Sequence, residues 1–374
     1  MRFLPRILAR TFLVVLLAGA VVVGAGRTGA AAAETEPSGG PAAAQGGATG
    51  PHEASGAALY TKYCALCHGP DAKGYAADNA PSLITPQFLS AADDSFLVNS
   101  IALGRPDTAM AAYGAQSGGP LSTDQIQDIV AFLRSHGPAY QAPQKHPSGS
   151  AKGGAKTYSE TCAQCHGDRR TRGNAVHLAN PTFIGLAGDD FLYDSISRGR
   201  DGTPMKAYGK ELEPEQIADV VAYLRTWSVG APQALVRPRE TVEGPVVLNP
   251  SGKSPDFSLH DDRFVPAADV KRALEEKRRM VIIDARVSSD WDREHITGAI
   301  SVPYYSLDGL NRVPNDGTWV IAYCACPHHA SGVVVDELRK RGYAHTAVID
   351  EGVLVWKERG YPMTGTEINS PDGK

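Results

Sequence analysis

One short motif occurs twice in this chain and limits what the chain can fold into. A Cys-x-x-Cys-His sequence spans residues 64–68 and returns at residues 162–166, an offset of 98. Gly104-Arg105, Met110 and Tyr113-Gly114 have counterparts at an offset of 95, and a later block recurs at 91. Small changes of offset between matched blocks are what loop-length variation on one fold produces. The sequence therefore predicts two copies of one domain.

The cysteine spacing in the motif predicts a covalently bound cofactor. Cys-x-x-Cys-His is the attachment sequence of c-type haem, because two thiols must reach the two vinyl groups on one porphyrin edge while the adjacent His reaches the iron. A thioredoxin-like redox pair or half of a zinc site would use similar cysteines. Neither copy has a second metal-type Cys pair or lies on a βαβ pattern. We predict two covalently attached haem c groups, held in the two copies by Cys64, Cys67 and His68, and by Cys162, Cys165 and His166.

Two methionines are the candidates for the second iron ligand. Met110 and Met205 are the methionines inside the repeated blocks, and they occupy equivalent, loop-like positions. A buried core Met is the alternative interpretation. His136 and His177 are rival ligands, but they are not equivalent between the copies. Ligation by His and Met raises the reduction potential and fills the iron, so it favours electron transfer over activation of a substrate.

Each repeated block resembles a class I, monohaem cytochrome c domain. The resemblance rests on a Gly and a Tyr in the first helix, the haem motif, the loop Met and a closing helix at 121–136 or 212–227. The first-helix residues are Gly56 and Tyr60, and Gly154 and Tyr158. It implies an all-α fold in each copy. It also implies a Pro whose carbonyl orients the iron-ligating His, and Pro81 and Pro181 match that residue.

The third block, residues 262–366, has a different pattern. Apolar strands alternate with helical stretches, which predicts an α/β domain with a parallel sheet. The expected helices are 267–279 and 332–342, and the expected strands are 281–283, 320–323 and 347–349. In such sheets chemistry collects beyond the carboxyl ends of strands. There the sequence places Cys-Ala-Cys-Pro-His-His-Ala-Ser at residues 324–331.

This block resembles the rhodanese-like domain. The matching segments are 283–286, 294–300, 302–303, 323–324, 351–353, Trp356 and 360–362. The resemblance implies that a loop cysteine takes up a sulfane sulfur as a persulfide. Counted from the strand the nucleophile is Cys324, whereas counting back from the helix end places it between Cys324 and Cys326. The loop has no Arg, so the Cys-x5-Arg anion cradle is absent and a phosphate or arsenate substrate is not expected.

Three uses remain open for Cys324 and Cys326: sulfur transfer, a redox dithiol, or a docking role without chemistry. His328 and His329 are expected either to lower the cysteine pKa, to ligate a metal with the thiols, or to be ordinary polar loop residues. Asp284, Arg286 and Glu294 are expected to be structural and to orient a strand and a loop.

The N-terminus predicts export. Residues 1–33 combine a basic start, a short apolar run and small residues before Glu34, which is typical of a cleaved signal peptide. The apolar run, 12–25, is shorter than the roughly 20 residues of a spanning helix, so an uncleaved anchor is the alternative. The remaining expected boundaries are a disordered linker at 34–52, cytochrome c domains at 53–137 and 153–229, and linkers at 138–152 and 230–261.

The predicted function is that of a periplasmic dihaem electron carrier that couples persulfide chemistry to one-electron transfer. The expected partners are a redox protein (another cytochrome, a copper protein or an oxidase) and a sulfur donor of the thiosulfate or persulfide type. A net charge of −4 gives no reason to expect nucleic acid. The alternative is a plain dihaem carrier whose rhodanese-like domain docks a partner and has no catalytic role.

Overall fold

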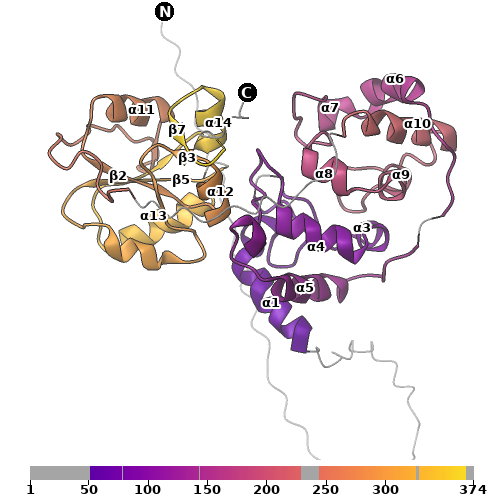
Figure 1. Cartoon of the computed structure of the whole chain (residues 1–374), viewed down its shortest axis with the longest axis horizontal. Coiled ribbons are helices and arrows are strands. Elements are labelled where there is room, and N and C mark those ends of the chain that lie inside the picture. The colour runs from indigo at the N-terminus through magenta and orange to yellow at the C-terminus, as the bar shows by residue number, and fades with distance from the viewer. Residues whose placement is uncertain (1–50, 78, 143, 229–243, 326–327, 368–374) are drawn as a thin grey trace, which may run out of the picture. The chain divides into compact units, whose positions relative to one another are not determined.

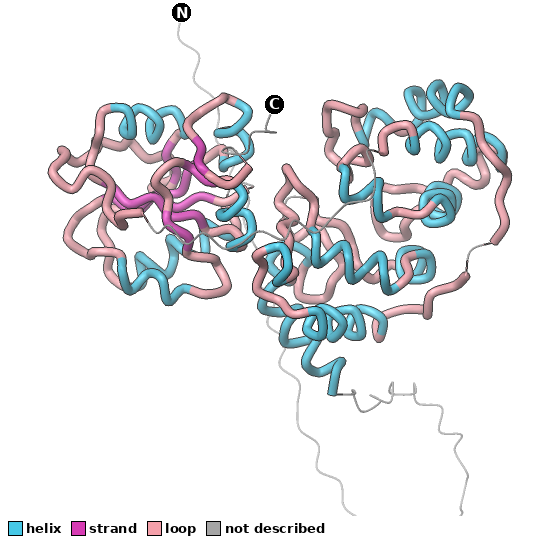
Figure 2. The backbone as a smooth tube through the Cα atoms, viewed as in Figure 1, coloured by secondary structure: helices cyan, strands magenta, loops and turns pink. Residues whose placement is uncertain are grey.

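The computed structural model describes residues 51–77, 79–142, 144–228, 244–325 and 328–367. The predicted signal peptide lies outside these residues. Within the described part of residues 51–228 the named elements are helices, and the named strands begin at Phe264 (Figure 2). The predicted order of two all-α domains followed by an α/β domain is confirmed. No helix in the described ranges combines the length and the apolar character needed to cross a membrane.

The first copy is built from helices around one apolar core (Figure 1). Its elements are α1 (Pro51–Tyr63), α2 (Ala65–His68), α3 (Pro86–Ala91), α4 (Asp94–Leu103), the 3-10 turn η1 (Ala115–Ser117) and α5 (Thr123–Arg134). Helices α1 and α5 pack against each other at Gly56, where a Cβ would lie 1.9 Å from the carbonyl oxygen of Asp128. A glycine is therefore required for this close approach.

The second copy repeats this arrangement. Its elements are α6 (Ala151–Thr161), α7 (Ala163–His166), α8 (Pro181–Leu186), α9 (Asp189–Arg198) and α10 (Pro214–Arg225). Helices α6 and α10 meet at Gly154, whose Cβ would lie 1.9 Å from the carbonyl oxygen of Asp219. The same glycine contact in both copies supports the duplication that the sequence predicts.

Part of the predicted linker at 138–152 belongs to the second copy. Helix α6 already begins at Ala151. Upstream of it, the His146 ring stacks on Tyr193 at 4.6 Å between centroids, and its Nε2 lies 2.9 Å from a carboxylate oxygen of Asp190. His146 lies inside the predicted linker, and the Gly/Pro composition of that segment gave no sign of these two contacts.

The C-terminal domain contains a five-stranded parallel sheet in the order β1-β6-β5-β2-β4. In chain order its elements are β1 (Phe264–Val265), α11 (Ala267–Glu275), β2 (Met280–Asp284), α12 (Ser288–Arg293), β3 (His295–Ile296), β4 (Ile300–Ser301), the 3-10 helix η2 (Leu307–Arg312), β5 (Trp319–Tyr323), α13 (Ala330–Lys340), β6 (Thr346–Ile349), α14 (Gly352–Glu358) and β7 (Met363–Thr364). Strands β3 and β7 form a separate antiparallel pair. The predicted parallel sheet is confirmed.

Helices cover both faces of this sheet, as Figure 1 shows. Alternate residues of a strand point to opposite faces. Met280 and Ile282 of β2 therefore pack in one apolar cluster, with α11 and α14, while Val281 and Ile283 pack in another, with α13. Because both faces are buried, the strands appear in the sequence as continuous apolar runs.

The described part of the predicted linker at 230–261 is not a linker. The backbone of Leu248 exchanges hydrogen bonds with that of Met280, and Phe257 packs edge-on against Trp319 at 5.3 Å between ring centroids. The linker expectation was wrong for these residues. It rested on the high proline content of the segment and overlooked the short apolar run 246–248, which packs on the sheet.

The two helix-crossing glycines predict a stability effect. Replacing Gly56 or Gly154 with Ala should lower the free energy of unfolding by about 1–3 kcal/mol, because the added Cβ meets a backbone carbonyl that only a helix shift can relieve. Urea unfolding of the full chain followed by circular dichroism measures this effect. Gly188→Ala is the matched control, since no heavy atom lies within 4 Å of a Cβ at that position. Equal stability of all three variants would contradict the packing argument.

Candidate functional site

The motif histidine of the first copy is held by a backbone carbonyl. His68 ends the one-turn helix α2, directly after α1 and Cys64. Its Nδ1 lies 2.9 Å from the carbonyl oxygen of Pro81. A carbonyl only accepts, so Nδ1 carries the proton and Nε2 keeps the lone pair that can bind a metal. Burial lowers the pKa of His68 although the hydrogen bond to Pro81 opposes this, so the imidazole is kept in its neutral, ligating form. Pro81 is the residue that the resemblance assigns to this task.

The second copy uses a different residue for the same purpose. His166 Nδ1 lies 2.7 Å from the carbonyl oxygen of Val176, and burial lowers the pKa of His166 as well. The prediction that Pro181 supplies this carbonyl is wrong. Pro181 is instead the first residue of α8, after the helix cap Asn180, whose side chain accepts from the Phe183 N–H.

The sequence contained a signal that identifies the correct residue. Pro181 has its counterpart 95 residues earlier at Pro86, which opens α3 after the capping residue Thr85. The carbonyl lies 13 residues after His68 but 10 residues after His166. The loop after the motif histidine is thus three residues shorter in the second copy, and this shortening accounts for the fall of the repeat offset from 98 to 95.

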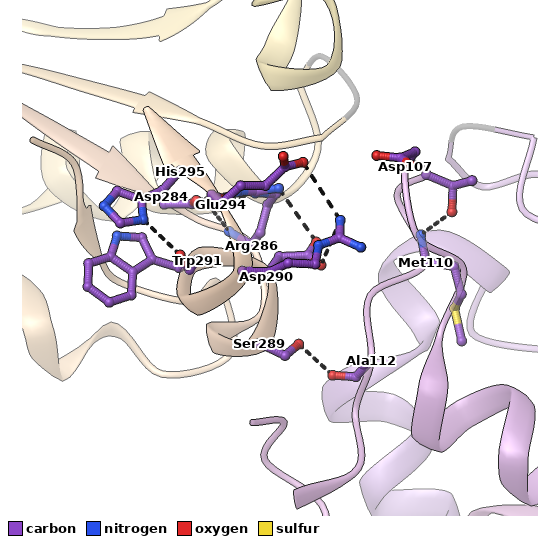
Figure 3. A network of polar contacts seen from close by, with 12 residues as sticks. Asp107, Met110, Ala112, Asp284, Arg286, Ser289, Asp290, Trp291, Glu294 and His295 are labelled. Carbon is purple, nitrogen blue, oxygen red and sulfur yellow. Dashed lines mark hydrogen bonds and ion pairs between the residues drawn. The ribbon is translucent and has the colours of Figure 1, made fainter. Parts of the chain in front are cut away.

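The two candidate methionines stand in loops of the same geometry. Each Met carbonyl accepts from the backbone N–H of an Arg five positions earlier, and each Met N–H donates to a Thr hydroxyl two positions earlier. Figure 3 shows Met110 and this last contact. Both methionines line the same cavity. Met110 does so with Cys64, Cys67 and His68, and Met205 with the corresponding motif residues of the second copy.

The rival histidines are engaged elsewhere. His136 Nδ1 bonds the carbonyl oxygen of Phe132 one turn earlier in the chain, at 2.8 Å. His177 lines the cavity of the second copy, but its Nε2 bonds the carbonyl oxygen of Asp168 at 2.9 Å. Neither has an equivalent in the other copy, whereas Met110 and Met205 do.

Each copy also places an arginine in the cavity wall, at a position that sequence reasoning did not single out. Arg105 donates to the Gly104 carbonyl and the Ser100 hydroxyl, and Arg200 donates to Gly199 and Ser195 in the same way. Burial lowers the pKa of each guanidinium to about 10.

The positive charges of these arginines would suit a negatively charged ligand in the cavity. Among the described residues neither Arg105 nor Arg200 forms an ion pair with a carboxylate. Both guanidiniums lie over phenylalanine rings, Arg105 over Phe183 and Arg200 over Phe191, and the charge of Asp194 acts on Arg200 from beyond ion-pair distance. A desolvated cation without a paired carboxylate is costly. A haem group bears two propionate carboxylates, so the wall residues match its chemistry: thiols and imidazole at one edge, a thioether from the loop, and a cation for the propionates.

In the third domain the first loop cysteine is positioned by its neighbours. Cys324 directly follows β5, is 3% exposed, and its Sγ lies 3.2 Å from the hydroxyl oxygen of Ser331. The Cys324 carbonyl accepts from the Val353 N–H at 2.9 Å. Gly352 has a φ of +73°, and a Cβ there would lie 3.1 Å from that carbonyl oxygen, so a glycine allows this close approach. Cys326, the second candidate, lies outside the described residues.

A buried ionic network fixes the strand end that carries Cys324 (Figure 3). Arg286 donates to both carboxylate oxygens of Asp284 and to the carbonyl of Glu294. The neighbouring residue Tyr323 donates its hydroxyl to Asp284 at 2.7 Å and accepts from the Ile296 N–H. Asp284, Arg286 and Glu294 thus have structural contacts, in line with the expectation from the sequence.

This network predicts a stability effect. Asp284→Asn should lower the free energy of unfolding by about 1.5–3 kcal/mol, because it removes the hydrogen-bonded partner charge of the buried Arg286 guanidinium and leaves Asp290, at 3.7 Å, as the remaining carboxylate. Thermal and urea unfolding measure the loss. Asp336→Asn is the control: it removes the same charge from an exposed pair with Arg263 and should change stability little. A similar effect of the two substitutions would show that the network does not support β5.

Comparisons with known proteins agree with this division of the chain. Residues 53–137 match the family model for cytochrome c, residues 149–224 the model for subunit III of cbb3-type cytochrome c oxidase, and residues 266–359 the rhodanese-like domain.

Curated relatives and solved structures cover parts of the chain. Subunit CcoP of a cbb3-type cytochrome c oxidase from Azospirillum sp. (strain B510) is 27% identical over 196 residues, which are 47% of this chain and 62% of that protein. Subunit FixP from Azorhizobium caulinodans is 30% identical over 183 residues, 47% of this chain and 60% of that protein. The match thus spans about three fifths of the length of these relatives.

A solved rhodanese-like domain from Anabaena sp. is 28% identical and covers 29% of this chain and 84% of its own, with a TM-score of 0.27. The family models and the helical and α/β parts of the structure coincide. The chain therefore carries two cytochrome c-type domains followed by a C-terminal rhodanese-like domain.

Proposed function

We propose that this protein is an exported dihaem electron carrier that couples sulfane-sulfur chemistry at its rhodanese-like domain to one-electron transfer. Its cytochrome c-type domains make it a haem electron carrier. The observation that carries the count of two haems is the repeated site: from both copies a neutral imidazole, a cysteine pair, a loop Met and a half-buried Arg line one cavity.

Each residue of the repeated site has a role toward the haem. The paired thiols would form the thioether links, His68 or His166 would bind the iron through Nε2, and Met110 or Met205 would supply a second iron ligand. Arg105 and Arg200 would pair with the propionates. When bound, a haem held by His and Met supplies reversible one-electron transfer. The protein residues hold it, exclude water through the apolar core, and set its potential.

The partner class follows from this chemistry. A one-electron carrier needs partners that also exchange single electrons. We therefore propose that the acceptor is a redox protein: another cytochrome, a copper protein or an oxidase. The curated relatives are named as oxidase subunits, which favours an oxidase. We place the protein in the periplasm on the strength of the N-terminal segment, with residues 1–33 as the signal peptide.

The sulfur step begins at the cysteine loop. The Cys324 thiolate attacks the outer sulfur of a persulfide or thiosulfate, the sulfur–sulfur bond of the donor breaks, and a thiol or sulfite leaves. Ser331, whose hydroxyl oxygen is 3.2 Å from Sγ, is placed to donate a hydrogen bond to the thiolate. Cys326 is the second thiol of the same loop and is the alternative nucleophile.

Oxidation of the bound sulfur links this step to the haems. When the outer sulfur of the cysteine persulfide leaves as sulfite, it takes three oxygen atoms from water and releases six protons and four electrons. The haem groups, when held by the two cytochrome c-type domains, would supply the one-electron acceptors for these electrons, and a redox partner would take them on. Sulfur transfer alone is electron-neutral, so the fusion of the two domain types supports an oxidative step.

Persulfide should therefore reduce the haems in a cysteine-dependent way. Mixing the oxidised protein with glutathione persulfide in a stopped-flow instrument should produce haem reduction in the wild type. Cys324→Ser, Cys326→Ser or the double variant should slow it by tenfold or more, because the sulfur can no longer be bound. Dithionite should reduce all variants alike. Equal rates with persulfide would reject the coupling and favour a docking role for the rhodanese-like domain.

The loop methionines should set the haem potentials. Met110→Leu and Met205→Leu should each lower the midpoint potential of one haem and remove the absorbance band of its Met–iron bond, because the thioether ligand raises the potential. Spectroelectrochemistry measures both properties. Met363→Leu, in β7 of the rhodanese-like domain, is the control. Unchanged spectra in either Met110→Leu or Met205→Leu would exclude that Met as a ligand.

A further inference from the structure

The loop that carries Met110 is covered, whereas its counterpart in the second copy is not. Ala111 and Tyr113, which follow Met110, are buried, with exposed fractions of 4% and 9%. Their counterparts at an offset of 95 are Lys206, which is exposed, and Tyr208, which is half-buried. The two loops have the same internal hydrogen bonds. The difference in burial therefore comes from what packs against them.

Contacts between the two copies do not explain this difference. The Pro106 carbonyl accepts from the Asn180 side chain at 2.8 Å, and the counterpart of Pro106, Asp201, donates its N–H to the Gln87 side chain at 3.3 Å. Each loop thus has a hydrogen bond to the other copy.

Helix α12 of the rhodanese-like domain covers the Met110 loop. All described residues belong to one compact unit. The hydroxyl of Ser289 donates to the Ala112 carbonyl at 2.6 Å, and Figure 3 shows this bond reaching the loop that carries Met110. The Ser288 hydroxyl donates to the carbonyl of Gly118, directly after η1, at 3.0 Å. Both serines are buried, where a hydroxyl and a carbonyl each need such a partner.

A second contact reaches the chain just before the first haem motif. Tyr304, between β4 and η2, donates its hydroxyl to the Tyr63 carbonyl at 2.6 Å, and the Tyr113 hydroxyl donates to the same carbonyl at 3.1 Å. The two hydroxyl oxygens lie 3.1 Å apart. Tyr63 ends α1 and directly precedes Cys64. The Tyr304 hydroxyl therefore meets the end of the Met110 loop, at Tyr113, and the helix that leads into the motif.

The third contact is an ion pair at the edge of this surface. Lys357 Nζ lies 2.8 Å from Oδ1 of Asp107 and 2.9 Å from Oε1 of Glu294. The Asp107 side chain is 70% exposed, and exposed pairs contribute little to stability. The serine and tyrosine hydroxyls are therefore the contacts that hold the loop. In the second copy Gly202 stands at the position of Asp107, and no heavy atom lies within 4 Å of a Cβ built there.

We propose that the rhodanese-like domain is a clamp on the Met110 loop, with Ser289 and Tyr304 as its positioning residues, and that it makes the two haem sites unequal. The inference rests on the proposed ligation of iron by Met110. A Met ligand separates from iron only when its loop moves, so contacts that fix the loop keep the thioether in place. The first site thus has a fixed ligand. The second, whose loop is exposed, is the site where another molecule displaces the Met more readily.

Hydrogen exchange in the full-length holoprotein tests the clamp. Ser289→Ala and Tyr304→Phe should each raise the exchange rate of the amides in residues 105–114 by about fivefold, the effect of losing one hydrogen bond. Residues 200–209 should keep their rate. Tyr343→Phe is the matched control, because its hydroxyl donates to the Val313 carbonyl inside the rhodanese-like domain. Wild-type exchange of residues 105–114 in both variants would overturn the proposal.

Displacement of the Met by imidazole provides a readout that a purely structural role would not change. In a Met205→Leu background, the absorbance band of the Met–iron bond reports on the first site. Its loss on addition of imidazole should be about fivefold faster after Ser289→Ala or Tyr304→Phe, and unchanged after Tyr343→Phe. In a Met110→Leu background, the band of the second site should disappear faster than that of the first, at a rate that neither substitution alters.

The outcomes separate the clamp from its premise. Faster hydrogen exchange without faster displacement by imidazole would overturn the proposal, because the loop would then move without releasing the Met. A missing band in the Met205→Leu background would reject Met110 as an iron ligand. Hydrogen exchange of residues 105–114 would still decide whether the rhodanese-like domain holds the loop.

Discussion

The cytochrome c-type domains depend on one hydrogen bond in each copy, from Nδ1 of the motif histidine to a backbone carbonyl. In the first copy the acceptor is Pro81 and in the second it is Val176. The bond fixes which nitrogen carries the proton and leaves Nε2 available. Since burial also lowers the pKa of both imidazoles, the fold holds a neutral imidazole at a set position. The helices before the motif and the loops after it are arranged around that requirement.

The rhodanese-like domain orients an imidazole by the same physical means but with a different acceptor. A carbonyl is neutral and leaves the imidazole a weak base, which suits a metal ligand. The carboxylate of Asp350 accepts from Nε2 of His328 and from Nε2 of His260, so in these two rings Nε2 carries a hydrogen. The bond to a carbonyl thus leaves Nε2 of the motif histidines available, whereas the bond to Asp350 occupies Nε2 of His328.

The arginines of the two kinds of domain differ in their charge partners. Arg286 has its counter-charge within the chain, at Asp284, and the network closes on itself around Tyr323. Arg105 and Arg200 are also desolvated, yet among the described residues they donate only to carbonyl and hydroxyl oxygens. Arg286 is thus paired inside its own fold, whereas Arg105 and Arg200 are in a position to pair with the haem propionates proposed above.

The amino-acid sequence by itself determined the duplication, the haem motifs, the loop methionines and the order of fold classes, because each of these depends on residues close together in the chain or on a repeat. It also contained the correct counterpart of Pro81, since a loop shortened by three residues moves the acceptor to Val176, but matching by residue type led to Pro181. Only the tertiary structure decided that residues 246–248 pack on the sheet and that Asp350 joins His260 to His328. These groups are up to 90 residues apart, and they meet because a parallel sheet in the order β1-β6-β5 brings three separate segments to adjacent positions.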